Sequence, residues 1–130
     1  MLKISLVTSA LAAALMLSNA QAAEGSKAYT QCMDKASSTS LMSTCIQSES
    51  ARQDARLNQA YKQLMGKLAA PKQKTLREVQ RNWITYRDSN CTFWGRLNDG
   101  TISQLDGAMC IKDMTESRAH ELERMLNPEG

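Results

Sequence analysis

The sequence has few of the residues from which most enzyme active sites are built. It contains a single histidine, His120, and its four cysteines form no C-x-x-C motif. Structural zinc sites draw on closely spaced cysteine and histidine ligands, and a nucleophilic centre needs a base beside the nucleophile. A glycine-rich phosphate loop is also missing from the sequence. We therefore predict no catalytic, metal-binding or cofactor-binding residues and no enzyme activity.

Strand-forming residues are scarce as well. Aromatic residues make up 5% of the sequence. No segment shows the two-residue alternation of polar and apolar residues that a half-buried strand requires. The sequence therefore predicts an all-α protein.

The first residues have the pattern of a secretory signal. Lys3 precedes an apolar run from Ile4 to Leu17, and Ala20-Gln21-Ala22 offers the small residues that signal peptidase recognises. The run is shorter than the ~20 residues of a membrane span, and no later segment is comparably apolar. We expect residues 1–22 to be a cleaved signal peptide and residues 23–130 to form a single domain without membrane insertion. The expected location is the periplasm, with secretion as the alternative.

The charge is almost balanced over the chain but unevenly distributed. Loss of Lys3 would leave 15 basic residues against 13 acidic ones, too small an excess to indicate nucleic acid or an anionic membrane as a partner. Residues 62–81 carry six basic side chains, Arg77 and Arg81 among them, and one acidic side chain, whereas residues 99–129 carry seven acidic side chains and three basic ones. A solvated surface explains this distribution, and a patch for a charged partner is the alternative.

The four cysteines indicate disulfides, because an even number in an exported chain is usually paired. Four cysteines allow three pairings. Cys32 and Cys45 bracket a serine-rich turn, and Cys91 and Cys110 bracket an Asn-Asp-Gly turn. Each neighbouring pair flanks a place where the chain can reverse, so we predict these two bridges.

Apolar residues recur with helical spacing along the rest of the chain. The pattern predicts a short helix near residues 29–36 and long helices near residues 40–68, 71–94 and 105–126. Helices joined by short turns run antiparallel. The expected fold is an antiparallel up-down-up three-helix bundle with a short N-terminal helix, stapled by two disulfides. Among the residues expected to face inward are Leu57, Ala60, Leu64, Leu76, Val79, Trp83, Ile84, Trp94, Leu105, Leu122 and Met125.

Several polar residues fall on these apolar stripes, where a buried charge needs a partner. Folding the helices about their turns brings Arg87 level with Asp54, and Arg118 level with Gln80 and Asn58. We predict that these residues form a structural polar network that fixes the register of the helices. Neighbouring Asp88 is expected to point outward.

The blocks "DARLNQAYKQL" (54–64), "QRNWITYRDSNC" (80–91) and "TESRAHEL" (115–122), with Cys45, Glu49 and Cys110, resemble the LprI-like family of small exported proteins named for lysozyme inhibition. The resemblance covers nearly the whole mature chain. The signature positions that it implies are Asp54, Asn58, Tyr61, Gln80, Trp83, Tyr86, Arg87, Asp88, Thr115 and Arg118.

The resemblance implies an exported, non-enzymatic binding protein that inhibits lysozyme or a related cell-wall hydrolase. The alternative is a periplasmic envelope accessory, adaptor or immunity-type protein with no action on lysozyme. The acidic loop and last helix are the surface that we expect to dock against a basic protein partner. The candidate residues for this surface are Asp99, Asp106, Asp113, Glu116 and Glu123.

Overall fold

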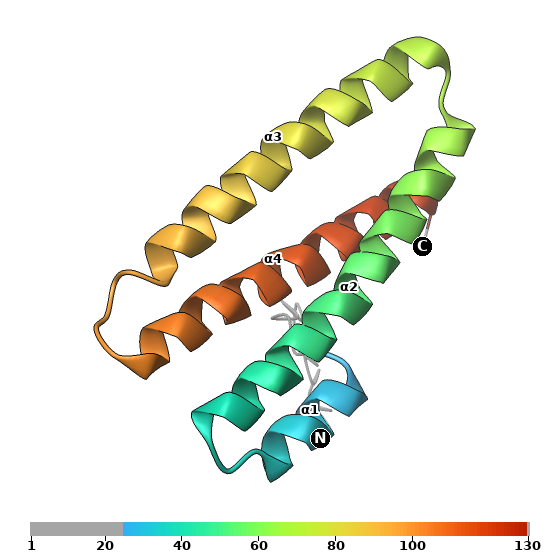
Figure 1. The fold of residues 1–130 in the computed structure, drawn as a ribbon. Helices are drawn as coiled ribbons and strands as arrows, with labels where there is room; N and C mark the ends of the chain where they lie inside the picture. Colours follow the sequence, from blue (N-terminus) through green and yellow to red (C-terminus); the bar gives the residue numbers. More distant parts are fainter. Residues whose placement is uncertain (1–24, 130) are drawn as a thin grey trace, which may run out of the picture.

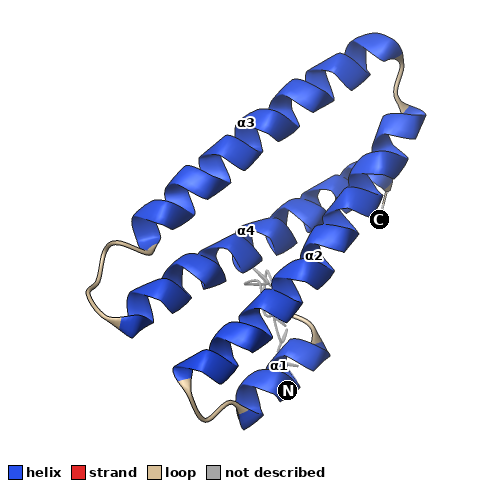
Figure 2. Ribbon diagram, in the orientation of Figure 1, coloured by secondary structure: helices blue, strands red, loops and turns tan. Residues whose placement is uncertain are grey.

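The computed structural model describes residues 25–129, so the expected signal peptide lies outside the described residues. This part of the chain contains four helices and no strand (Figures 1 and 2). The helices are α1 (Lys27–Lys35), α2 (Thr39–Lys67), α3 (Ala70–Trp94) and α4 (Thr101–Leu126). The all-helical prediction is confirmed. Within residues 25–129, no helix is both long and apolar enough to cross a membrane.

Local sequence signals account for the helix boundaries. The Ser38 side chain accepts a hydrogen bond from the backbone amide of Leu41 and so caps α2. Pro71 lies in the first turn of α3, where its missing N–H has no cost. Gly100 precedes α4 with a φ of 96°, a conformation that glycine adopts readily. Serine, proline and glycine thus mark the three long helices.

The hydrophobic core lies mainly between α2 and α4, which pack closely against each other. Ala60 and Ala119 lie at this contact, and their small side chains let the two helices approach. Leu122 is completely buried between the helices. The core cluster consists of Leu57, Ala60, Leu64, Leu76, Ala119 and Leu122.

Helix α3 is less well covered than the sequence pattern predicted. It packs against α4, but α2 and α3 diverge from their shared turn and contact each other little (Figure 1). Val79, Ile84 and Trp94 are 45%, 39% and 49% exposed, so the prediction that they face inward is wrong. Met125 on α4 is also exposed. The up-down-up bundle with one enclosed core is not confirmed, because α4 lies against α2 and leaves the outer part of α3 without a neighbour.

A covalent bond and a close backbone contact hold the end of α3 on α4. Cys91 and Cys110 form a disulfide with their Cα atoms 5.3 Å apart, as predicted. One turn beyond, Gly95 and Gly107 face each other. A Cβ atom on Gly107 would lie 3.2 Å from the carbonyl oxygen of Cys91 and 3.3 Å from the Cα atom of Gly95. A side chain at position 107 would therefore push the two backbones apart by a few tenths of an ångström, so glycine there favours their close approach.

The short helix α1 is fixed to α2 by the other predicted disulfide, between Cys32 and Cys45. It also reaches α4, because the ring of Tyr29 lies 4.7 Å from the buried ammonium group of Lys112. A cation held over an aromatic face in this way is stabilised by the ring quadrupole. Helix α1 thus closes one end of the α2–α4 pair.

Glu49 ties the start of α1 to the interior of α2. Its fully buried carboxylate accepts hydrogen bonds from the amide and hydroxyl of Ser26, at 2.7 Å each, and from the side chains of Arg52 and Gln53, also at 2.7 Å. Burial by itself raises the pKa of a carboxyl group, but the hydrogen bonds outweigh it and lower the pKa of Glu49 to about 2.

We predict that Glu49 makes folding stability depend on pH. Its pKa is lower in the folded state than the ordinary value of 4.5, so its contribution is complete above that value and is lost as the pH falls towards 2. A shift of this size corresponds to about 3 kcal/mol at neutral pH. Glu49→Gln should remove most of this contribution and flatten the acid limb in urea-unfolding experiments between pH 2 and 7. The exposed Glu78→Gln variant is the control, and an equal change in both variants would contradict the prediction.

We also predict that the two disulfides stabilise different parts of the fold. The Cys91–Cys110 bridge joins residues that are 19 positions apart in the sequence. Its removal should lower the free energy of unfolding by about 3 kcal/mol, because the unfolded chain gains conformational entropy. In the double variant Cys91→Ser/Cys110→Ser, amide hydrogen exchange should accelerate in α3, with helix content by circular dichroism retained. Cys32→Ser/Cys45→Ser should accelerate exchange in α1 instead. Uniform acceleration over all helices in both variants would contradict this assignment.

Candidate functional site

The predicted contact between Arg118 and Gln80 is present at the centre of the molecule. Nε of Arg118 donates to Oε1 of Gln80 at 3.0 Å, and both side chains are buried. Nη1 of Arg118 donates to Glu121 at 2.6 Å. The guanidinium group also lies 6.0 Å from the ring of Trp83. This part of the polar network connects α3 to α4, as predicted.

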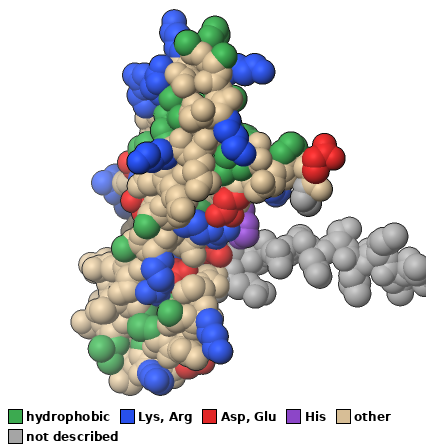
Figure 3. Space-filling model, turned by 90° about the vertical axis from the view of Figure 1, so that its right-hand side faces the viewer, with side chains coloured by type: hydrophobic (Ala, Val, Ile, Leu, Met, Phe, Trp, Pro, Cys, Tyr) green, Lys and Arg blue, Asp and Glu red, His purple; other side chains and the backbone are tan. Residues whose placement is uncertain are grey.

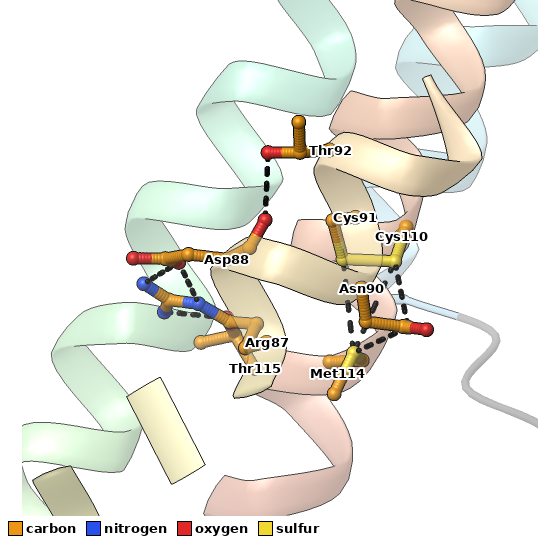
Figure 4. The surroundings of a disulfide bond; sticks show 8 residues. All are labelled: Arg87, Asp88, Asn90, Cys91, Thr92, Cys110, Met114 and Thr115. Carbon is orange, nitrogen blue, oxygen red and sulfur yellow. Dashed lines mark hydrogen bonds and ion pairs between the residues drawn. A yellow bond between two sulfur atoms is a disulfide. The ribbon is translucent and has the colours of Figure 1, made fainter. Parts of the chain in front are cut away.

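The predicted ion pair between Arg87 and Asp54 is wrong. Arg87 pairs with Asp88 at 2.9 Å and donates to the hydroxyl of Thr115 at 3.4 Å (Figure 4). Asp54 accepts a hydrogen bond from Asn58 on its own helix at 3.1 Å. The divergence of α2 and α3 separates the two residues, so Arg87 turns to α4 for a partner. Asp88 is exposed, as expected, although it is also the ion-pair partner of Arg87.

The separation of the helices creates an open groove, which we call the α2–α3 groove. Its volume is about 400 Å³. Four of its residues belong to α2 and six to α3. The lining residues are Asp54, Leu57, Asn58, Tyr61, Arg77, Gln80, Arg81, Trp83, Ile84 and Arg87. Asp54, Asn58, Gln80 and Arg87 of the predicted network therefore meet at this groove, although they do not all bond to one another.

The floor and rim of the groove differ in chemistry. Tyr61 and Trp83 are half-buried and present aromatic surface. Arg87 lies over the ring of Trp83 at 5.1 Å, which fixes the orientation of both side chains. Arg77 and Arg81 are exposed. This combination of a partly apolar floor and polar, charged edges suits binding of a ligand or partner.

The disulfide borders the α3–α4 contact near the lower end of the groove. The side-chain nitrogen of Asn90 lies 3.3 Å from the sulfur of Met114 and 3.6 Å from that of Cys110 (Figure 4). Arg87 and Cys91 are four residues apart, so the Arg87–Asp88 pair and the disulfide lie on successive turns of α3. The position of Arg87 in the groove is therefore set by the covalent attachment of α3 to α4.

The five acidic residues predicted to form a docking surface do not share one free surface. Glu116 is buried with its carboxylate 3.8 Å from the ammonium group of Lys112. Glu123 is held by two hydrogen bonds from Arg56, at 2.5 and 2.6 Å. The prediction of a free acidic surface is therefore wrong for these two residues, because their face of α4 packs against α2.

The other three acidic residues lie in the loop before α4 and in the first half of that helix. Asp99 is exposed in the loop, and Asp106 accepts a hydrogen bond from Asn98 at 3.3 Å. Asp113 pairs with Lys112. Asp106 and Asp113 line a second hollow of about 330 Å³, beside Trp94. All three residues keep some access to solvent, but Asp106 is already bonded to Asn98 and Asp113 to Lys112.

The ion pair of Arg56 and Glu123 shifts the titration of Glu123. Hydrogen bonds from Arg56 outweigh partial burial and lower the pKa of Glu123. His120 lies beside this pair, with Nδ1 3.1 Å from Nη2 of Arg56, and its side chain is 54% exposed, as expected for a residue on the polar face. Among residues 25–129, no three histidine, cysteine or acidic side chains come together in a way that could hold a metal ion.

The two arginines at the rim of the groove, Arg77 and Arg81, were among the lining residues that the sequence did not single out as site residues. Arg77 and Arg81 were counted only as members of the basic stretch from 62 to 81. That stretch was the available signal, because Arg77, Gln80, Arg81 and Ile84 are spaced by three or four residues and share one side of a helix.

Comparison with known proteins agrees with the blocks found in the sequence. The family model described as lysozyme inhibitor LprI matches residues 32–122, which include both disulfides and the whole α2–α3 groove. The uncharacterized protein R02472 of Rhizobium meliloti (strain 1021) is 24% identical over 106 residues, covering 71% of this chain and 76% of that protein. No solved structure matches. The extent of the family match, over most of the chain, shows that the protein belongs to the LprI lysozyme inhibitor family.

Proposed function

We propose that the protein is an exported, non-enzymatic inhibitor that binds a lysozyme or a related cell-wall hydrolase. The observation that carries this proposal is the match of residues 32–122 to the family of lysozyme inhibitors. Inhibition by binding requires a shaped surface and no catalytic groups. The α2–α3 groove and its arginine-rich rim offer such a surface.

The expected location is the periplasm. The first 22 residues have the charge, apolar run and small residues of a cleavable signal. The two disulfides support this location, because such bonds persist in oxidising compartments and are rare in the cytosol. In this proposal the inhibitor meets its partner outside the cytoplasm, where cell-wall hydrolases act.

Several features favour tight binding to a folded partner. Disulfides fix α1 on α2 and α3 on α4 before any partner arrives. A surface that is already ordered loses little conformational entropy on binding. Exposed Ile84 and the aromatic side chains beside it would gain from burial against a partner.

The proposal predicts saturable inhibition of at least one lysozyme type. Protein comprising residues 23–130 should slow the clearing of a cell-wall suspension by chicken-type, invertebrate-type or goose-type lysozyme, to an extent that reaches a plateau at equimolar inhibitor. It should also slow cleavage of a soluble chitooligosaccharide, because binding to the enzyme acts on any substrate.

Two results would contradict this proposal. Slower clearing without slower cleavage of the soluble substrate would mean that the protein coats the cell wall. No effect on any lysozyme type, together with recovery of another envelope protein by cross-linking, would favour the adaptor function. Protein reduced and alkylated at all four cysteines serves as the control, with lower inhibition expected because α3 loses its attachment to α4.

A further inference from the structure

The rim of the α2–α3 groove has an excess of positive charge. Three arginines line the groove, Arg77, Arg81 and Arg87, against one carboxylate, Asp54. Arg87 is already paired with Asp88. In the described part of the chain, neither Arg77 nor Arg81 has a carboxylate within ion-pair distance. Two guanidinium groups at the rim are therefore free to bind carboxylates from outside.

The charge continues beyond the groove to the turn between α2 and α3. Lys67, Lys72 and Lys74 are exposed there, with Glu78 as the one acid among residues 62–81. Figure 3 shows lysine and arginine side chains gathered at this upper end of the molecule. Charges of one sign on a projecting end attract an oppositely charged surface and speed association.

The floor of the groove adds the residue types that dominate binding energy at protein interfaces. Trp, Tyr and Arg are enriched among the interface residues whose truncation costs most. Trp83 and Tyr61 are half-buried here, and Ile84 is 39% exposed beside them. Arginine binds a carboxylate through two parallel hydrogen bonds, which provides orientation as well as attraction. The groove therefore joins an aromatic floor to a rim that selects acidic side chains.

From these observations we propose that the α2–α3 groove, with Arg77 and Arg81 at its rim, is the docking surface for an acidic segment of the inhibited hydrolase. This inference rests on the proposed function. A glycoside hydrolase carries paired carboxylates at its catalytic cleft, so an acidic segment bordering that cleft is a fitting partner. Docking there covers the cleft and blocks the substrate. The proposal reverses the polarity expected from the sequence, which placed the docking surface on acidic residues.

Charge reversal at the rim tests this assignment. Arg77→Glu/Arg81→Glu should weaken binding to the inhibited lysozyme at least tenfold, measured by titration calorimetry, and should raise the inhibitor concentration for half-inhibition equally. The matched control is Lys27→Glu/Lys35→Glu, which makes the same charge change on exposed residues of α1 and should change affinity less than threefold. Both pairs are exposed, so the fold should be retained, which circular dichroism checks.

Neutralising the acidic loop and helix residues provides the opposing test. Asp99→Asn/Asp106→Asn/Asp113→Asn should bind the lysozyme within threefold of the unmodified protein. If this variant loses inhibition and the Arg77→Glu/Arg81→Glu variant keeps it, the assignment of the groove is overturned while the proposed function stands.

A probe without lysozyme separates the groove from the proposed function. In a Trp94→Phe background, Trp83 is the one tryptophan left to report on the groove. A ten-residue oligoglutamate peptide should change the fluorescence of Trp83 at low salt. The change should disappear in Arg77→Glu/Arg81→Glu. It should also disappear at 0.5 M salt, because the Debye length falls to about 4 Å and the charges are strongly screened. No fluorescence change in the Trp94→Phe protein overturns the inference, whatever the result with lysozyme.

Discussion

The attachment of α3 to α4 is the constraint on which the shape of the molecule depends. Helices α2 and α4 supply most of the hydrophobic core, whereas α3 has little buried surface, because only Leu76, Gln80 and Cys91 are buried on it. Its position is determined by the turn from α2, the Cys91–Cys110 disulfide and the close passage of Gly95 over Gly107. Because the turn holds one end of α3 near α2 and the disulfide holds the other end on α4, α3 diverges from α2 along its length. The groove is therefore a consequence of how α3 is fixed.

Much of the fold could be predicted from the sequence because its signals are local. The period of apolar residues, the capping Ser38 and the breaks around Pro71 and Gly100 determine where helices begin and end. The disulfide pairing could also be predicted, since each pair of cysteines flanks one turn. The contact of Gln80 with Arg118 followed from counting residues along antiparallel helices. In each case the result depends on position along a helix.

The angle between helices could not be read from that count. A contact between Arg87 and Asp54 requires the antiparallel helices α2 and α3 to stay side by side along their length, and the sequence contains no signal for the divergence that separates them. The same divergence leaves Ile84 exposed. The burial of Glu116 was missed for a related reason, because the acidic side of α4 has its own cation, Lys112, and packs inward. Periodicity identifies a face of a helix, but the neighbour that covers the face decides its role.

The Cys91–Cys110 bridge makes the geometry of the groove dependent on the oxidation of the chain. A newly made chain with reduced thiols can form its helices, because their signals are local, but it lacks the bond that sets α3 against α4. Arg87 would then lose its fixed distance from Thr115 and from the residues on α2. The final geometry of the groove thus depends on a separate chemical event that follows synthesis, the oxidation of the Cys91 and Cys110 thiols.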